Sequence, residues 1–415
     1  MVARLPGFPV SRRWVTGQPG NPSNLHAMLF KILTTLILTI ARFFALDQIW
    51  CDAAEATAMR AAQEPIPFFV REAVHDVAVV ERDVIVVTGL APERQLVRSS
   101  GRREDETLVT ATQKGSLGGD WLMADEHRWW YGTMGEHDGC IDTTFVRDDG
   151  EGDGEIETSA VPAAGSPPYI WLPLKGDKPR ALQLSFGDTG NLLLTEIDPT
   201  GALRSWHLPW RSYVTHAQSA ERLPDGRIAY VTHQNGGDRL MLVLLGDNER
   251  ADIVMLGYAM TVQLATAVDS AGRLAIVSSM KDRRILGTVI DPDHPVPLTW
   301  HELGTEARLT GNMRELQVIA TSDGFVAAWL SRGGEERSQL LARELKTNRA
   351  GIAAIGIGEP LDRNREIFFS LRGEGGEPVF YWDDGRQLVR RRLPVSLAGY
   401  DFVQGLASLF CNVHH

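Results

Sequence analysis

The sequence predicts an all-β repeat protein, a β-propeller of about six to eight blades. From about Asp76 onward, short β-rich runs are broken by Gly, Asp and Asn, there is almost no sustained 3.6-residue periodicity, and one hairpin pattern recurs. The composition is that of a globular chain, with 415 residues, 43% hydrophobic residues, 23% charged residues and 40 glycines. Stacked β-sandwich domains are the alternative arrangement for such strands.

The region before the predicted propeller has the features of an export signal. Residues 28–46 are mostly apolar, and Ala54 and Ala56 supply an A-x-A cleavage pattern behind them. An uncleaved anchor from Met28 to Leu46 is the alternative, since 19 residues can just span a bilayer. Both alternatives predict an extracytoplasmic protein, periplasmic or secreted, that meets the membrane only through such an anchor. The predicted regions are a mis-assigned or disordered leader at 1–27, a signal peptide or signal anchor at 28–56, and the propeller at 57–415.

Cysteine usage is consistent with export. Cys51 follows Trp50, where a lipidation motif requires a small residue. If cleavage follows Ala56, the mature chain keeps Cys140 and Cys411, and an oxidising compartment would allow them to pair. The sequence leaves open whether they do.

The charge distribution excludes nucleic acid as the main partner. All 53 acidic residues lie at or beyond Asp47, whereas five of the 42 basic residues precede it, so the remainder carries a formal net charge of −16. A body this acidic repels phosphate backbones unless it has a local basic patch.

The recurring pattern consists of a Gly turn, an apolar strand, a polar hairpin and a second apolar strand. The leading glycines, 190, 226, 272 and 324, are 36, 46 and 52 residues apart, which suits one four-stranded blade per copy. A closed ring of blades buries both faces of such hairpins and leaves only short edges. The predicted strands are Val77–Val80 and Val84–Val87, Leu192–Leu194 and Leu203–Leu208, Ile228–Val231 and Leu240–Leu245, Leu274–Val277 and Ile285–Ile290, Phe325–Trp329 and Leu340–Leu345, and Ile367–Ser370 and Val379–Trp382.

The fourth copy is similar to a known family. Asp323–Trp329, followed by a Gly-rich turn and Leu340–Arg343, resembles a blade of the sialidase-type (BNR-like) bacterial propellers. That family's Asp-box has a residue between its Asp and its Gly, whereas Ser322, Asp323 and Gly324 are contiguous here. The arginine cluster, Tyr–Glu pair and Asp of sialidase chemistry cannot be assigned in this sequence. The resemblance therefore implies a propeller architecture and no activity.

An acidic, glycine-rich loop is the candidate metal site. Asp149, Glu151, Asp153 and Glu157 occupy positions 1, 3, 5 and 9 of the run, and Gly154 at position 6 allows a tight turn. Oxygen ligands at this spacing suit Ca²⁺, and the run resembles the calcium loops of integrin-type propellers. A solvated acidic loop is the alternative. A structural calcium ion bound by these four residues is the one cofactor that we predict.

Four aromatic residues are the candidate ligand-binding residues. Trp129, Trp130, Tyr131 and Trp210 lie near predicted turns. Aromatic side chains exposed at loop ends can stack on sugars or anchor a protein partner. Packing between blades is the alternative role for them.

Two classes of function remain open. One is a non-catalytic binding or scaffold module for a protein or glycan partner. The other is a glycan-active hydrolase, which requires two or three carboxylates to converge at glycosidase spacing. No catalytic set is recognisable in the sequence, so catalytic residues stay unassigned and binding is favoured over enzymatic activity.

Overall fold

A computed structural model describes the chain between residues 64 and 393, and all described residues belong to one compact unit, Thr57–Leu406. The predicted leader at 1–27 and signal segment at 28–56 lie outside the described residues. Within the described part, no helix has the length and apolarity needed to cross a bilayer. Inside the range, the residues not described are 67, 69–72, 81–82, 90–92, 100–105, 113–120, 125–127, 138–139, 149–155, 177, 210–217, 234–238, 259–260, 296–297, 306–314, 334–336, 348, 352–354, 358–360, 363–366, 375 and 384–386.

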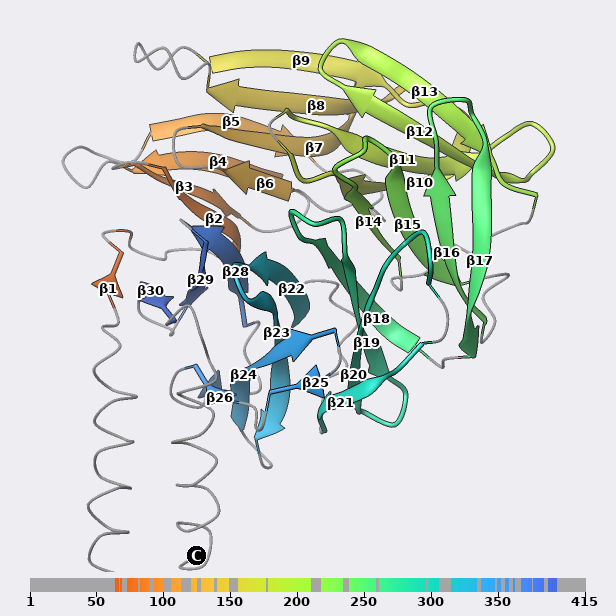
Figure 1. Ribbon diagram of the computed structural model, residues 1–415. Helices are drawn as coiled ribbons and strands as arrows, with labels where there is room; N and C mark the ends of the chain where they lie inside the picture. Colours follow the sequence, from red (N-terminus) through yellow and green to blue (C-terminus); the bar gives the residue numbers. More distant parts are fainter. Residues whose placement is uncertain are drawn as a thin grey trace, which may run out of the picture. The chain divides into compact units, whose positions relative to one another are not determined.

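The described strands form seven sheets that are the blades of a propeller ring (Figure 1). Blade 1 contains β2 (Val74–Val80), β3 (Asp83–Thr88), β4 (Glu93–Ser99) and β5 (Glu106–Thr112). Blade 2 contains β6 (Trp121–Ala124), β7 (Trp129–His137), β8 (Cys140–Asp148) and β9 (Ile156–Pro162). Blade 3 contains β10 (Ser166–Pro173), β11 (Ala181–Phe186), β12 (Leu192–Asp198) and β13 (Gly201–His207). Blade 4 contains β14 (Ser219–Arg222), β15 (Ile228–His233), β16 (Arg239–Leu245) and β17 (Ala251–Tyr258).

The last three blades complete the ring. Blade 5 contains β18 (Thr261–Val268), β19 (Leu274–Met280), β20 (Ile285–Ile290) and β21 (His301–Gly304). Blade 6 contains β22 (Leu316–Thr321), β23 (Gly324–Gly333), β24 (Arg337–Lys346) and β25 (Arg349–Ala350), and β26 (Ile355–Gly356) and β27 (Leu361–Asp362) also pair with β24. Blade 7 contains β28 (Phe369–Glu374), β29 (Glu377–Asp383), β30 (Leu388–Arg392) and β1 (Glu64–Pro65). The predicted propeller is confirmed, with seven blades.

The hydrophobic core lies between neighbouring blades. The middle strands are buried on both faces, as in β15, where all six residues are buried. One apolar cluster joins Leu184 and Trp206 of blade 3 to Tyr230 and Val243 of blade 4. A middle strand packs against a neighbouring blade on each face, which explains why its sequence is a continuous apolar run and not an alternating one.

The recurring glycines mark real turns, but one of them is out of phase with the others. Gly226, Gly272 and Gly324 lie between the first and second strands of blades 4, 5 and 6, whereas Gly190 lies between the second and third strands of blade 3. The equivalent residue in blade 7 is Gly376, so the corresponding glycines are 46, 52 and 52 residues apart. All five have positive φ, which glycine adopts at no steric cost. The predicted spacing of 36 is therefore not a blade repeat.

Two sets of contacts close the ring. β1 pairs antiparallel with β30, and the Ile66 amide donates to the Leu388 carbonyl at 3.0 Å, so the start of the described chain supplies the fourth strand of the last blade. Near the axis, Arg372 of β28 donates to the Val77 carbonyl at 2.7 Å and to the Leu122 carbonyl at 2.9 Å. Arg372 also forms an ion pair with Asp76 at 2.9 Å. One side chain of blade 7 thus holds blades 1 and 2.

Removal of residues 1–56 is expected to leave a folded propeller, whereas removal of residues 1–67 is expected to destabilise it. The longer deletion takes away β1 and buried Ile66, which costs about 2 kcal/mol or more and exposes the edge of β30. Thermal melting followed by β circular dichroism measures the difference. Equal melting temperatures for the two truncated chains would contradict this role of β1.

Arg372→Met should lower the free energy of unfolding by about 2 kcal/mol, because it removes one ion pair and two hydrogen bonds from a site that is mostly buried. The control is Arg392→Met, since Arg392 is 53% exposed and its carboxylate partners are 3.6 Å or more away. That change should cost less than about 1 kcal/mol. Urea denaturation measures both, and equal losses would show that ring closure does not depend on Arg372.

Candidate functional site

A cavity lined mainly by cations lies between blades 3 and 4. Its volume is about 150 Å³. At one end of the ring, turns join the first strand of each blade to the second and the third strand to the fourth. We call this end the AB end, and the cavity lies there. We call the cavity the cationic cavity; its lining residues are Leu174, Lys175, Gly176, Lys178, Arg180 and Arg222.

The loop between β10 and β11 brings most of these side chains together. The Leu174 amide donates to the Arg180 carbonyl at 3.0 Å, which closes the loop and fixes where β11 begins. Arg222 enters from blade 4, as the last residue of the innermost strand β14. The cavity therefore depends on the junction between two blades and not on one loop alone.

A buried glutamate fixes the arginines that form the wall. Glu196 of β12 is fully buried and accepts from Arg180 Nη1 at 2.9 Å, from Arg204 Nε at 2.5 Å and from Arg222. Charge-assisted bonds of this kind offset the cost of burying a carboxylate. Since Arg180 and Arg204 belong to blade 3 and Arg222 to blade 4, Glu196 holds both sides of the junction.

Arg222 remains cationic in this setting. Burial lowers the pKa of Arg222, the Glu196 carboxylate raises it, and the neighbouring Arg180 and Arg204 lower it further. Arg222 keeps its proton under such conditions because the ordinary pKa of an arginine side chain lies far above neutral pH. Arg180 and Arg222 keep 25% and 22% of their side-chain surface exposed, so each can present a charge to the cavity.

The cationic cavity has more positive than negative charge. Lys175 pairs with Glu221 at 3.2 Å, and Arg204 pairs with both Glu196 and Asp247. Lys178 is exposed, and among the described residues it has no ion-pair partner. Among the described residues, and with every group ionised, the cations (Lys175, Lys178, Arg180, Arg204, Arg222) exceed the carboxylates (Glu196, Glu221, Asp247) by two. Asp177 of the same loop lies outside the described residues. The site can therefore hold an anionic group.

Three of the four residues of the predicted aromatic site are buried. Trp129, Trp130 and Tyr131 lie in β7 and are 2%, 6% and 0% exposed. Trp129 and Tyr131 pack in the core between blades 1 and 2. Trp130 packs on the opposite face, and its ring centroid lies 6.3 Å from that of Phe145. The expectation that these three residues are exposed for ligand contact is wrong, because they belong to a strand buried on both faces. Trp210 lies outside the described residues.

The predicted calcium loop falls almost entirely on undescribed residues. Asp149, Glu151 and Asp153 lie outside the described part of the chain. Glu157 lies in β9, where Arg147 Nε donates to its carboxylate at 2.6 Å. Where the structure describes the chain, no three His, Cys, Asp or Glu side chains gather as a metal site would require. Calcium binding stays a prediction, as does pairing between Cys140, which lies in β8, and Cys411, which is not described.

The structure also contains a Tyr–Glu pair that the sequence did not reveal. The Tyr381 hydroxyl donates to Glu374, and Arg390 lies 5.9 Å from the tyrosine ring and pairs with the same carboxylate. Burial, and then the Glu374 carboxylate, raise the pKa of Tyr381 above its usual range. Tyr381 has no exposed surface and packs between blades 7 and 1. A buried phenol with a raised pKa is a structural group and not a nucleophile.

The cationic cavity was not predicted from the sequence. Lys175, Lys178 and Arg180 are three cations within six residues of an otherwise acidic chain, and this local excess of positive charge was the available signal. Arg222 and Glu196 come from other strands, so their place beside the loop follows only from the fold.

Comparisons with known proteins identify no family for this chain. No family model matches the chain, and no curated protein matches it. Among solved structures, a catalytically inactive virginiamycin B lyase from Staphylococcus aureus is 11% identical with a TM-score of 0.46, covering 80% of this chain and 99% of its own. AofleA from Arthrobotrys oligospora is 10% identical with a TM-score of 0.43, covering 71% of this chain and 89% of its own. The NanB sialidase from Streptococcus pneumoniae is 8% identical with a TM-score of 0.40, covering 80% of this chain and 70% of its own. Similarity at this level says nothing about the family or the activity of this chain.

Glu221→Gln should stabilise the protein increasingly as the pH rises. Burial raises the pKa of Glu221 against the opposing effect of Lys175, so the folded state retains the proton to higher pH than the unfolded state does. The wild type therefore loses stability as the pH rises above about 4.5, towards the raised pKa, and the glutamine variant lacks this loss. Melting temperatures between pH 4 and pH 8 test this, with Glu302→Gln as an exposed control. A difference between variant and wild type that stays constant with pH would contradict it.

Proposed function

We propose that the chain is an exported, non-catalytic binding propeller that recognises an anionic group of a glycan or protein partner in the cationic cavity. The observation that carries the proposal is the excess of cations at this cavity, in a chain whose body has a formal net charge of −16. Cations gathered at one cavity repel one another, and a bound anion would relieve that repulsion.

The chemistry of the wall favours binding over catalysis. Among the described residues, two glutamates pair with cations that line the cavity: Glu196 and Glu221 have 0% and 6% of their side-chain surface exposed. A general acid or base must reach the proton that it transfers. Arginine and lysine, in contrast, are suited to holding carboxylate, sulfate or phosphate groups through charge-assisted hydrogen bonds.

The size of the cavity limits what is recognised. A volume of about 150 Å³ can take one anionic group with its nearest atoms, such as an acidic sugar residue or an acidic side chain. A long polyanion would instead meet the acidic body outside the cavity and be repelled. The partner is therefore expected to present one or a few anionic groups.

Binding of inorganic phosphate, and of acidic and neutral oligosaccharides and peptides, tests the proposal. We expect phosphate and acidic ligands to bind the wild type, and Lys178→Gln to weaken binding by about fivefold, equivalent to the loss of about 1 kcal/mol from one exposed charge contact. Lys178 is a safe position to change, because among the described residues it has no ion-pair partner whose loss would disturb the fold.

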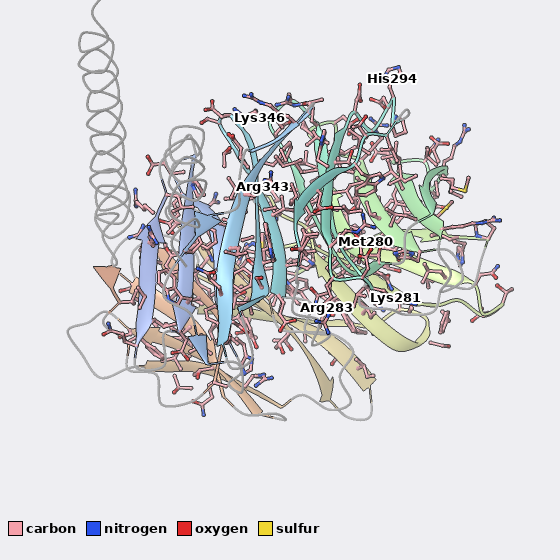
Figure 2. All side chains as sticks on the ribbon, turned by 90° about the horizontal axis from the view of Figure 1, so that it is seen from below. Met280, Lys281, Arg283, His294, Arg343 and Lys346 are labelled. Atoms are coloured by element: carbon pink, nitrogen blue, oxygen red, sulfur yellow. The ribbon has the colours of Figure 1, made fainter. Side chains whose placement is uncertain are left out.

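The matched control is Lys281→Gln. Lys281 is an exposed lysine in the turn between β19 and β20. This turn lies at the end of the ring opposite the AB end, whereas Lys346 and His294 lie at the AB end (Figure 2). Calorimetry at constant ionic strength should show a loss of affinity for Lys178→Gln only. Equal effects of the two changes, or equal binding of neutral and acidic ligands, would overturn the proposal.

A further inference from the structure

One buried carboxylate beside the cationic cavity is balanced by a single cation. Glu221 of β14 has 6% of its side-chain surface exposed and pairs with Lys175 at 3.2 Å, and in the part of the chain that the structure describes no second cation pairs with it. By comparison, the buried carboxylate of Glu196 accepts hydrogen bonds from three arginines. Burial of a carboxylate is costly unless cations and donors compensate it, so Glu221 is the less stabilised of the two anions.

The described elements around β14 bring little other charge to Glu221. The innermost strands of the adjacent blades, β10 and β18, have no charged side chain. β15 has only His233, four residues beyond Ala229, which lies opposite Glu221 in the sheet. The other titratable side chains of these strands are Tyr169 and Tyr230. Ions at the ends of these strands pair elsewhere: Arg180 and Arg222 with Glu196, Arg227 with Asp225 and Asp293, and Arg273 with Asp269. Asp177 and residues 210–217 lie outside the described residues.

Lys175 belongs both to this ion pair and to the wall of the cavity. Its side chain is 46% exposed and lines the cationic cavity. A lysine ammonium group has three donors on a flexible stem, so it can turn from one anion to another. While Glu221 is ionised, it balances the charge of Lys175. Protonation of Glu221 removes that balance and, among the described residues, raises the excess of cations over carboxylates from two to three.

The burial of Glu221 favours its protonated form. Burial raises the pKa of Glu221 against the opposing effect of Lys175. Glu221 therefore takes up its proton at a higher pH than an exposed glutamate does, and it loses the proton as the pH rises through the raised pKa. A ligand anion that binds Lys175 competes with the carboxylate, so anion binding and protonation of Glu221 favour each other by linkage.

We propose that Glu221 controls the anion affinity of the cationic cavity: as a carboxylate it occupies Lys175, and as a neutral acid it leaves Lys175 free to hold the ligand. Glu221 is a positioning residue, because it acts through Lys175 and does not itself line the cavity. The inference rests on the proposed function and adds a regulation to it. The cavity binds its anion more tightly in mildly acidic solution than in alkaline solution.

Sulfate binding to the full-length chain between pH 4.5 and pH 8 tests this inference, because sulfate stays a dianion over the whole range. Calorimetry at constant ionic strength should show about fivefold tighter binding to the wild type at pH 4.5 than at pH 8, the effect of one exposed charge contact. Glu221→Gln has no charge at residue 221. It should bind sulfate at pH 8 about as tightly as the wild type does at pH 4.5, so the two profiles converge in acid.

Asp247→Asn is the matched control. Asp247 is 85% exposed and pairs with Arg204, which does not line the cavity. This variant keeps Glu221 and should keep the dependence on pH of the wild type. Parallel profiles for the wild type and Glu221→Gln would overturn the inference, even where Lys178→Gln confirms anion binding in the cavity. Absence of sulfate binding at every pH would overturn the proposed function as well.

Lys175→Gln keeps the inference testable if Glu221→Gln does not fold. Without Lys175, protonation of Glu221 has no cation to release into the cavity. Sulfate binding to Lys175→Gln should therefore be weaker than to the wild type at pH 4.5 and should vary little with pH. A variant with the full dependence on pH of the wild type would overturn the inference.

Discussion

The structure depends on the polar contacts between the innermost strands, because a ring of blades is stable only when it closes. Arg372 contacts blades 1 and 2 from blade 7, and elsewhere Ser219 and Thr266 join blades 4 and 5 through their hydroxyls at 2.7 Å. The Gln317 side chain donates to the Phe369 carbonyl at 2.8 Å and accepts from the Leu371 amide at 2.7 Å, which joins blades 6 and 7. These bonds are directional, so they fix the order and the angle of blades that apolar packing alone would allow to slide.

The cationic cavity follows from the same constraint. Contacts at the AB end hold successive blades together there: Arg204 of blade 3 pairs with Asp247 of blade 4, and Arg227 of blade 4 pairs with Asp293 of blade 5 at 2.7 Å. The Trp206 indole adds a bond to the Gly246 carbonyl at 3.0 Å. With the junction between blades 3 and 4 fixed in this way, Glu196 can be buried against arginines from both blades. Rigid placement of this kind lowers the entropy that a ligand would lose on binding.

The fold was predictable from the sequence because each blade buries its middle strands on both faces. This leaves apolar runs such as Leu240–Leu245 bounded by turn residues, and the structure has strands there. The assignment of each glycine turn to a pair of strands within its blade was harder to predict. A glycine with positive φ indicates a tight turn but does not indicate which two strands the turn joins, as Gly190 shows. The pairing of β1 with β30 joins residues more than 300 positions apart, and local pattern contains no information about it. Predictions for Trp129 and Tyr131 failed for a related reason: proximity to a predicted turn does not determine whether a side chain is exposed.

The sequence shows the cations of the cationic cavity that lie in one loop, but it does not show the net charge of the site. Three of its cations lie within one loop, but the sequence does not show whether nearby carboxylates neutralise them. Glu196 neutralises part of the charge and positions the arginines, whereas Lys178 keeps its charge exposed. An acidic surface around such a site repels anions at long range and within about 10 Å leaves the local cations to dominate. For the anion binding that we propose, this arrangement would favour selectivity over fast capture, because an anion would gain its binding energy only after its shape had allowed it to enter the cavity.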